Sequence, residues 1–208
     1  MDRQREKQRL GKLFKILGAV FLCLLLVLGA FYIISILLQK DKVDYTEKQE
    51  GIFYFSADYD TPPTEDLVYL SKNRDVMFTD HLGNGELLTA DTAEDKNVKA
   101  LMYNYFVSLI EGDAEKHASL LSINYKKHFA VQKRFTPQKV YDIDVRFLTG
   151  GTENGVYSDK YQVAYKIYEN DGTYRADVGS GVAKLMVFEV VNDNGVYKIN
   201  SIVPMNIK

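Results

Sequence analysis

The sequence has a single cysteine among its 208 residues and no Asn-x-Ser/Thr acceptor for N-glycosylation. Cys23 lies inside a long apolar run, where we interpret it as a small packing residue, so the rest of the chain can form no disulfide. A domain folded from this chain must therefore be held together by its apolar core. Both absences fit a bacterial domain outside the cytoplasm, more readily one from a Gram-positive cell.

The sequence also lacks the short motifs of common enzymes: it has no nucleophile elbow, phosphate-binding loop, HExxH or CxxC. Its three histidines are His81, His117 and His128. In one continuous helix, His117 and His128 would lie roughly 16 Å apart along the axis, too far to share a metal ion or a proton. His81 stands in an expected surface loop. We therefore expect no catalytic residue, no metal site and no cofactor, and we interpret the protein as non-enzymatic.

One stretch dominates what is present. Residues 16–39 carry no charge and read ILGAVFLCLLLVLGAFYIISILLQ. A helix of about 24 residues is about 36 Å long and exceeds the hydrocarbon thickness of about 30 Å. Buried helices of soluble proteins are shorter and have a polar face, and a signal peptide has an apolar region of only about 7 to 15 residues and a small-x-small cleavage site, which is missing here. We predict a transmembrane helix that embeds these residues in the lipid bilayer.

The charges that flank this helix predict its orientation. Residues 1–15 contain six basic and two acidic residues, whereas residues 40–51 mix both signs. The positive-inside rule therefore places the N-terminus in the cytoplasm and the C-terminal domain outside, as a single-pass protein of the cell membrane. Beyond the basic tail the chain has 20 basic and 26 acidic residues, a net charge of −6. That sign argues against binding of nucleic acid by the outer domain.

The outer chain divides by composition. Residues 40–51 are charged and lack an apolar face, so we expect a linker. Residues 52–91 are rich in aromatic residues and interrupted by proline and glycine, which predicts an N-terminal extension that packs on the main domain. Within this extension, the segments 76–79 and 86–89 flank a glycine-containing loop and predict a hairpin. Residues 92–208 carry the pattern of the main domain.

The main domain begins with helical periodicity and ends with strand periodicity. From Thr92 to Ile110 apolar residues recur at helical spacing, Gly112 is suited to end this helix, and Asp113 is suited to cap the next. After Pro137 the period changes to two, which predicts an antiparallel meander of about four strands. One of these is a long strand expected over residues 173–191, with a bend at residues 179–181. The fold class is α+β.

Two segments resemble the nuclear transport factor 2-like superfamily, also called the cystatin-like cone. Residues 103–116 (YNYFVSLIEGDAEK) are similar to its opening helix-Gly-Asp-helix signature, and residues 194–202 (NGVYKINSI) are similar to its last strand. The resemblance covers residues 92–208 and implies a curved sheet wrapped around a helix to form a cone. The superfamily includes enzymes, binding modules and scaffolds, among them the inner-membrane scaffold of type IV secretion and conjugation machines, so the resemblance implies a fold and not an activity.

Two sets of residues are candidates for function. Asp142, Asp144 and Arg146 alternate with apolar residues on an expected strand, so we expect their charged face to be an interaction face. The expected lining of a pocket in the cone is Tyr161, Tyr165, Tyr168, Met186 and Phe188. The sequence thus predicts a membrane-anchored extracytoplasmic interaction or scaffold domain, which contacts a protein partner or a second copy of itself. The alternatives are a component of a conjugation or type IV secretion-like assembly and a cone that binds a small apolar ligand.

Overall fold

The computed structural model describes residues 59–170, 175 and 178–205, and all of these residues belong to one compact unit, Glu47–Lys208. The predicted tail, transmembrane helix and linker (residues 1–51) lie outside the described residues. In the part of the chain that is described, no helix is long and apolar enough to cross a membrane.

The described chain is an α+β domain with a six-stranded mixed sheet in the order β2-β1-β3-β4-β5-β6. The strands are β1 Val76–Thr79, β2 Gly85–Leu88, β3 Val140–Glu153, β4 Val156–Ile167, β5 Met186–Asp193 and β6 Val196–Pro204. Strands β3 to β6 are the antiparallel meander expected from the sequence. The expectation of about four strands is nevertheless too small, because the β1–β2 hairpin joins the same sheet through a parallel pairing of β1 with β3.

The helices are the short α2 Leu67–Leu70, the 3-10 helix η1 Ala90–Glu94, α3 Val98–Glu111, α4 Ala114–Ser119 and α5 Ile123–His128. Helix α3 begins later than the expected Thr92, because the side chain of Asn97 accepts a hydrogen bond from the amide of Ala100 and caps the helix there. It ends at Gly112 in the left-handed conformation, with φ of 71°, and Asp113 caps α4, as the sequence predicts.

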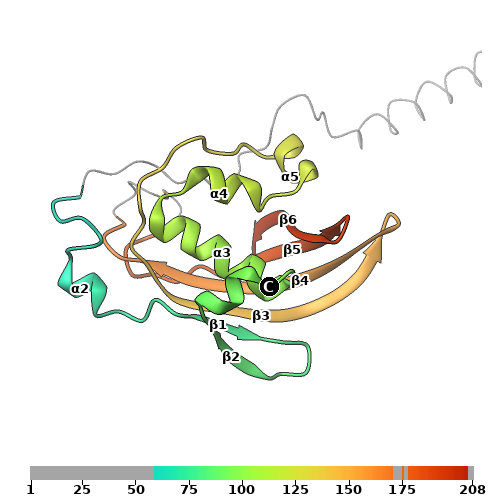
Figure 1. Cartoon of the computed structure of the whole chain (residues 1–208), viewed down its shortest axis with the longest axis horizontal. Coiled ribbons are helices and arrows are strands. Elements are labelled where there is room, and N and C mark those ends of the chain that lie inside the picture. Colours follow the sequence, from blue (N-terminus) through green and yellow to red (C-terminus); the bar gives the residue numbers. More distant parts are fainter. Residues whose placement is uncertain (1–58, 171–174, 176–177, 206–208) are drawn as a thin grey trace, which may run out of the picture. The chain divides into compact units, whose positions relative to one another are not determined.

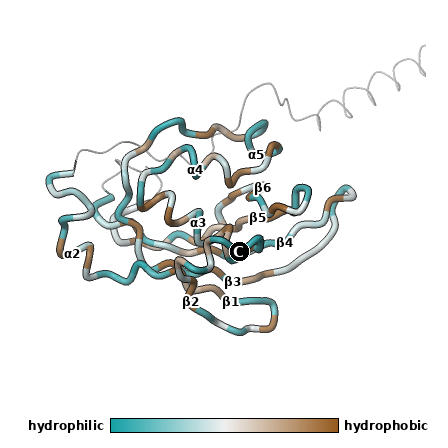
Figure 2. Tube along the Cα trace, in the orientation of Figure 1, coloured by the Kyte–Doolittle hydropathy of each residue, from teal (hydrophilic) through white to brown (hydrophobic). Residues whose placement is uncertain are grey.

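Helix α3 lies across one face of the sheet, and α4 and α5 follow on the same side (Figure 1). Hydrophobic residues recur along α3 and along the strands beneath it (Figure 2). Aromatic rings join these two layers: the ring centroids of Tyr105 and Phe188 are 5.1 Å apart, and those of Phe106 and Tyr165 are 5.4 Å apart. This helix-on-sheet arrangement buries one face of the sheet in a continuous core. We call it the inner face, and the opposite one the outer face.

The extension contributes to the same core. Val76, Phe78 and Leu88 of the β1–β2 hairpin are buried in the main apolar cluster. Tyr69 of α2 is 1% exposed, and its hydroxyl donates a hydrogen bond of 2.9 Å to the carbonyl of Val140, where β3 begins. The extension is therefore a structural part of the sheet and core.

A buried ion pair links the extension to the start of β3. The side chain of Lys139 is fully buried, with its ammonium nitrogen 2.5 Å from Asp66 of the extension and also paired with Glu169. The ring of Tyr59 lies 4.3 Å from the same nitrogen. Burial disfavours the charged lysine, but the two carboxylates outweigh it, so the pKa of Lys139 lies above its usual value. The hydrogen bond from Lys139 lowers the pKa of Asp66.

The segment between β4 and β5 differs from the expectation. A long strand was expected to start near residue 173, but the described residues there (175 and 178–185) form no strand, and β5 begins at Met186. The buried amide of Asn170 explains the difference, because it bonds the carbonyls of Arg175 and Val178 and the amide of Arg175. These bonds satisfy backbone groups within a loop that would otherwise require a partner strand.

Candidate functional site

The expected interaction face lies on the outer face of the sheet. Arg146 is exposed, and its side chain donates a hydrogen bond of 2.6 Å to the carboxylate of Asp144. Asp142 is exposed and lies 3.0 Å from the ammonium of Lys166 on the neighbouring strand. Their strand neighbour Val145 is fully buried on the inner face. The three side chains thus lie away from the apolar core, and each is held by an opposite charge.

A β-bulge in β3 alters the face that the sequence pattern predicts for one aromatic residue. Asp142 has φ of 50°, and the register between β3 and β4 shifts between Tyr141 and Asp144. Tyr141 is therefore opposite Lys166 and shares the outer face with it, although simple alternation would put its ring on the inner face. Its ring lies 4.8 Å from the ammonium nitrogen of Lys72 of the extension. The bulge thus adds an aromatic ring and a lysine to the charged face.

Exposed apolar residues adjoin these charges on the outer face. Met77 of β1 pairs directly with Asp144 on one side and with Leu87 of β2 on the other. The side chains of Met77 and Leu87 are 38% and 52% exposed. Side chains of directly paired residues lie on the same face of a sheet, so these apolar groups and the Asp144–Arg146 pair form one surface. We call Met77, Leu87, Asp142, Asp144 and Arg146 the outer patch.

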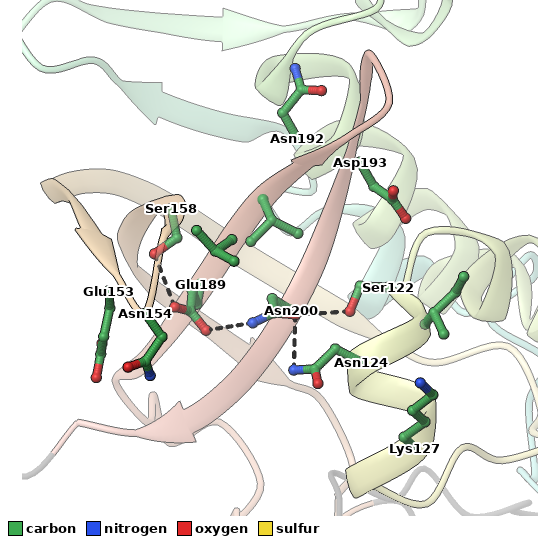
Figure 3. A pocket seen from close by; sticks show the side chains of 13 residues that line it. Ser122, Asn124, Lys127, Glu153, Asn154, Ser158, Glu189, Asn192, Asp193 and Asn200 are labelled. Carbon is green, nitrogen blue, oxygen red and sulfur yellow. Dashed lines mark hydrogen bonds between the residues drawn. The ribbon is translucent and has the colours of Figure 1, made fainter.

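A separate polar groove lies where α5 meets β5, β6 and the tip of the β3–β4 hairpin (Figure 3). Its volume is about 710 Å³. At its centre Asn200 occupies a bulge in β6, where the register with β5 shifts after Glu189. The amide of Asn200 donates to Glu189 at 2.9 Å and accepts from Ser122 at 3.0 Å and from Asn124 at 3.2 Å. The groove is thus built on one asparagine that ties α5 to the sheet.

Glu189 carries the charge of this network. Its carboxylate also accepts hydrogen bonds from Ser158 at 2.9 Å and from Ser201 at 3.1 Å. Partial burial raises the pKa of Glu189, but the hydrogen bonds from Asn200, Ser158 and Ser201 outweigh it and the net pKa lies below the usual value. A carboxylate held ionised by neutral donors is a poor general base, so we interpret the network as structural.

The five expected pocket residues lie in different environments. Tyr165, Met186 and Phe188 are buried in the core, where they fill the space between α3 and the sheet. The hydroxyl of Tyr165 accepts a hydrogen bond of 2.6 Å from Arg175. Tyr168 lies beside Lys72 of the extension and the buried Lys139, with its ring 4.6 Å from the ammonium nitrogen of Lys72 and 5.5 Å from that of Lys139. These four residues therefore do not meet at one opening.

Tyr161, the fifth expected pocket residue, borders a hollow of about 810 Å³ on the inner face, beyond the start of α3. The rings of Phe147 and Phe78 lie 5.6 and 5.8 Å from its ring. Sequence reasoning missed most of this lining. Alternation alone could have put Phe147 and Tyr161 on one face, but Phe78 reaches them only because β1 pairs with β3.

The histidines do not gather into a reactive group. His117 is buried against the rings of Tyr105 and Phe135, at 4.9 and 5.5 Å, and burial lowers its pKa to about 4. Its Nδ1 lies 3.4 Å from the hydroxyl of Ser108. The His81 ring lies 6.1 Å from that of Phe147 at the edge of the hollow. Within the described ranges, no three His, Cys, Asp or Glu side chains are grouped so that they could hold a metal ion.

Comparisons with models of protein families, with curated proteins and with solved structures found no match for this chain. The described residues form an α+β domain in which the space between α3 and the sheet is filled by side chains. The likeness to the nuclear transport factor 2-like superfamily stays a prediction that rests on residues 103–116 and 194–202.

Proposed function

We propose that this chain is a membrane-anchored domain, located outside the cytoplasm, that acts by contact with a protein partner and not by catalysis. The outer patch carries this proposal. It combines exposed apolar side chains with charges that are already paired, a composition typical of protein interfaces.

The proposed location rests on the sequence. The uncharged run of residues 16–39 is long enough to span a bilayer, and six basic residues precede it. The net charge of −6 beyond the tail disfavours a second attachment of the domain to anionic lipids. A domain held in this way meets its partners in the plane of the membrane.

The packing of the interior and the paired charges on the surface support a contact mechanism. Phe188 and Val163 are 0% exposed, and Tyr165 is 3% exposed, so side chains fill the space between α3 and the sheet. The charged groups of the outer patch are tied by hydrogen bonds to each other or to Lys166. Pre-arranged side chains lose less conformational entropy when a partner binds.

Photo-crosslinking in cells tests this proposal. A p-benzoylphenylalanine residue replaces Gln162, which lies opposite Arg146 on the outer face, and in a control it replaces the exposed Glu115 on α4. We expect a covalent product of discrete mass from position 162 and none from position 115. A product of twice the chain's mass would identify self-association, and any other discrete mass a different protein. Equal products from both positions, or none from position 162, would contradict a contact role for this face.

A further inference from the structure

The hollow beside Tyr161 is bounded by three parts of the chain. The extension contributes Phe78 and the β1–β2 turn, α3 contributes its first turn, and the β3–β4 hairpin contributes most of the remaining wall. Strands β3 and β4 continue beyond the first residue of α3 (Figure 1), so α3 does not cover that end of the inner face. The hollow thus lies at the first turn of α3, next to the filled interior between α3 and the sheet.

Aromatic rings make up much of its lining. Phe78, Phe147, Tyr157, Tyr161 and Tyr197 all border it. Tyr161 is nearly buried, whereas Tyr157 is 60% exposed. The lining thus offers ring surfaces from the floor of the hollow to its rim. Burial, and after it the nearby Asp159, raise the pKa of the Tyr161 hydroxyl.

Two carboxylates give the hollow a negative potential. The hydroxyl of Tyr157 donates a hydrogen bond of 3.1 Å to Asp159, and this pair lies over Gly150, where a Cβ atom would come within 2.6 Å of the Asp159 oxygen. The backbone amides of Asn84 and Leu82 fix Asp80, and the hydrogen bonds of Asn84 contribute most to lowering its pKa. Both acidic side chains are therefore held in place before any ligand arrives.

Lys99, which borders the hollow together with His81, indicates what the rings accept. The ammonium nitrogen of Lys99 lies 6.0 Å from the centroid of the Phe78 ring and is paired with Glu86. This is the distance at which an aromatic face attracts a cation. Since Glu86 neutralises Lys99, Asp80 and Asp159 leave the hollow with an excess of negative charge.

From this lining we infer that the hollow is a binding site for an organic cation, an alkylammonium group on a small apolar body. Rings attract such a cation through their faces, and Asp159 supplies its counter-charge. An anion would be repelled by the carboxylates, and a bare metal ion would lack a third ligand among the described His, Cys, Asp and Glu side chains. The site lies on the opposite face of the sheet from the outer patch, so it does not depend on the proposed contact function.

The test uses the full-length chain in a non-ionic detergent with 13C-labelled tyrosine rings. The probes are choline and its neutral isostere 3,3-dimethylbutan-1-ol, together with N-acetyl-lysine methylamide as a model of a protein side chain. Chemical shifts of Tyr157 and Tyr161, assigned with Tyr→Phe variants, are followed in each titration. Asp159→Asn removes the charge and keeps the oxygen that accepts from Tyr157. Asp75→Asn, just before the start of β1, removes one exposed charge from a residue that does not border the hollow.

We expect choline or the lysine model to shift the Tyr157 and Tyr161 resonances with saturation, and Asp159→Asn to weaken this binding roughly fivefold while Asp75→Asn leaves it unchanged. The neutral isostere should bind at least about tenfold more weakly than choline. The probe that binds more tightly shows whether the ligand is a free cation or a protein side chain. Equal binding of choline and its isostere, equal effects of the two Asp→Asn changes, or no saturable shift with either cation would overturn the inference.

Discussion

Gly112 joins α3 to α4 under two separate constraints. Its φ of 71° lies in the left-handed region, which costs a residue with a side chain free energy. A Cβ atom at this position would also come within 2.5 Å of the backbone nitrogen of Pro137 and 2.9 Å of the carbonyl carbon of Thr136. The backbone before β3 thus packs directly on the helix junction.

We expect Gly112→Ala to lower the free energy of unfolding by about 3 kcal/mol, because conformational strain and backbone overlap add. Gly83→Ala is the matched control, since Gly83 has φ of 83° but no atom within 4 Å of a Cβ. It should cost only about 1 kcal/mol. Urea denaturation of both variants measures the difference. Equal losses would show that the contact with Pro137 contributes nothing.

His117 makes stability depend on pH. Its pKa is about 4 in the folded chain, because burial disfavours the charged ring, against about 6.5 when unfolded. As the pH falls below about 6.5, the unfolded chain gains a proton that the folded chain does not bind until near pH 4. This group's contribution to stability is therefore present above pH 6.5 and is lost between pH 6.5 and 4, by about 3 kcal/mol in total.

The measurement is the free energy of unfolding at pH 7 and pH 4.5 for the wild type and for His117→Gln. We expect the variant to lose less stability between these pH values than the wild type does. His128→Gln, at the end of α5, should leave the wild-type slope in place. A wild-type slope in His117→Gln would mean that other groups cause the pH dependence.

At the scale of elements, the extension and the main domain share one sheet. Strand β1 pairs in parallel with β3. The backbone amide of Asp142, in the β3 bulge, donates a hydrogen bond of 2.8 Å to the carbonyl of Asn73 in the extension. The carboxylate of Asp66 in the extension pairs with the buried ammonium of Lys139. Removing one partner of a buried ion pair typically costs about 3 to 5 kcal/mol, since the other charge remains buried. The stability of β3 therefore depends on the extension that precedes it.

Asp66→Asn tests this dependence. Asparagine keeps the side-chain oxygen that caps α2, and it replaces the charged oxygen that accepts a hydrogen bond from Lys139 with a neutral amide nitrogen. We expect Asp66→Asn to lower the free energy of unfolding, because Lys139 then keeps only Glu169 as its charged partner. Glu65→Gln, an exposed neighbour, should change stability by less than about 0.5 kcal/mol. Thermal or chemical denaturation compares the two. Similar small effects would show that Lys139 is adequately paired by Glu169 alone.

The sequence predicts the helices and strands better than it predicts which of them lie side by side in the fold. Helical and strand periods correctly indicate α3, the Gly112–Asp113 junction, the β1–β2 hairpin and the meander, because each pattern is local. The parallel pairing of β1 with β3 depends on residues far apart in the chain, and no local pattern encodes it. Asp142 with its positive φ reverses the expected side of Tyr141, and alternation alone cannot reveal such a bulge.

Local sequence patterns also predict the candidate functional residues only in part. The charges of Asp142, Asp144 and Arg146 were expected on a solvent-facing strand, and the structure places them there. The expected pocket fails as a group, since Tyr165, Met186 and Phe188 fill the core. The polar groove depends on Asn200, an extra residue in a bulge, and nothing in its sequence context distinguishes it from an ordinary turn asparagine.

At the scale of the whole molecule, the account joins an uncharged N-terminal run to an acidic α+β domain with two different surfaces. The outer patch faces away from the helices, and the aromatic hollow lies on the helix-covered face. The compartment that the domain occupies decides which partners and ligands these two surfaces can meet. In the proposed arrangement, the orientation of residues 16–39 in the membrane decides that compartment.

Topology is measured most directly with a site-specific protease recognition sequence inserted at residue 45 and different epitope tags at the two termini. Protease is added to intact cells or protoplasts, with a detergent-permeabilised sample as the control for cleavage itself. The account predicts that protease added outside releases the C-terminal tag with the domain, while the N-terminal tag stays protected and membrane-bound. Cleavage only after permeabilisation, or loss of the N-terminal tag from outside, would contradict it.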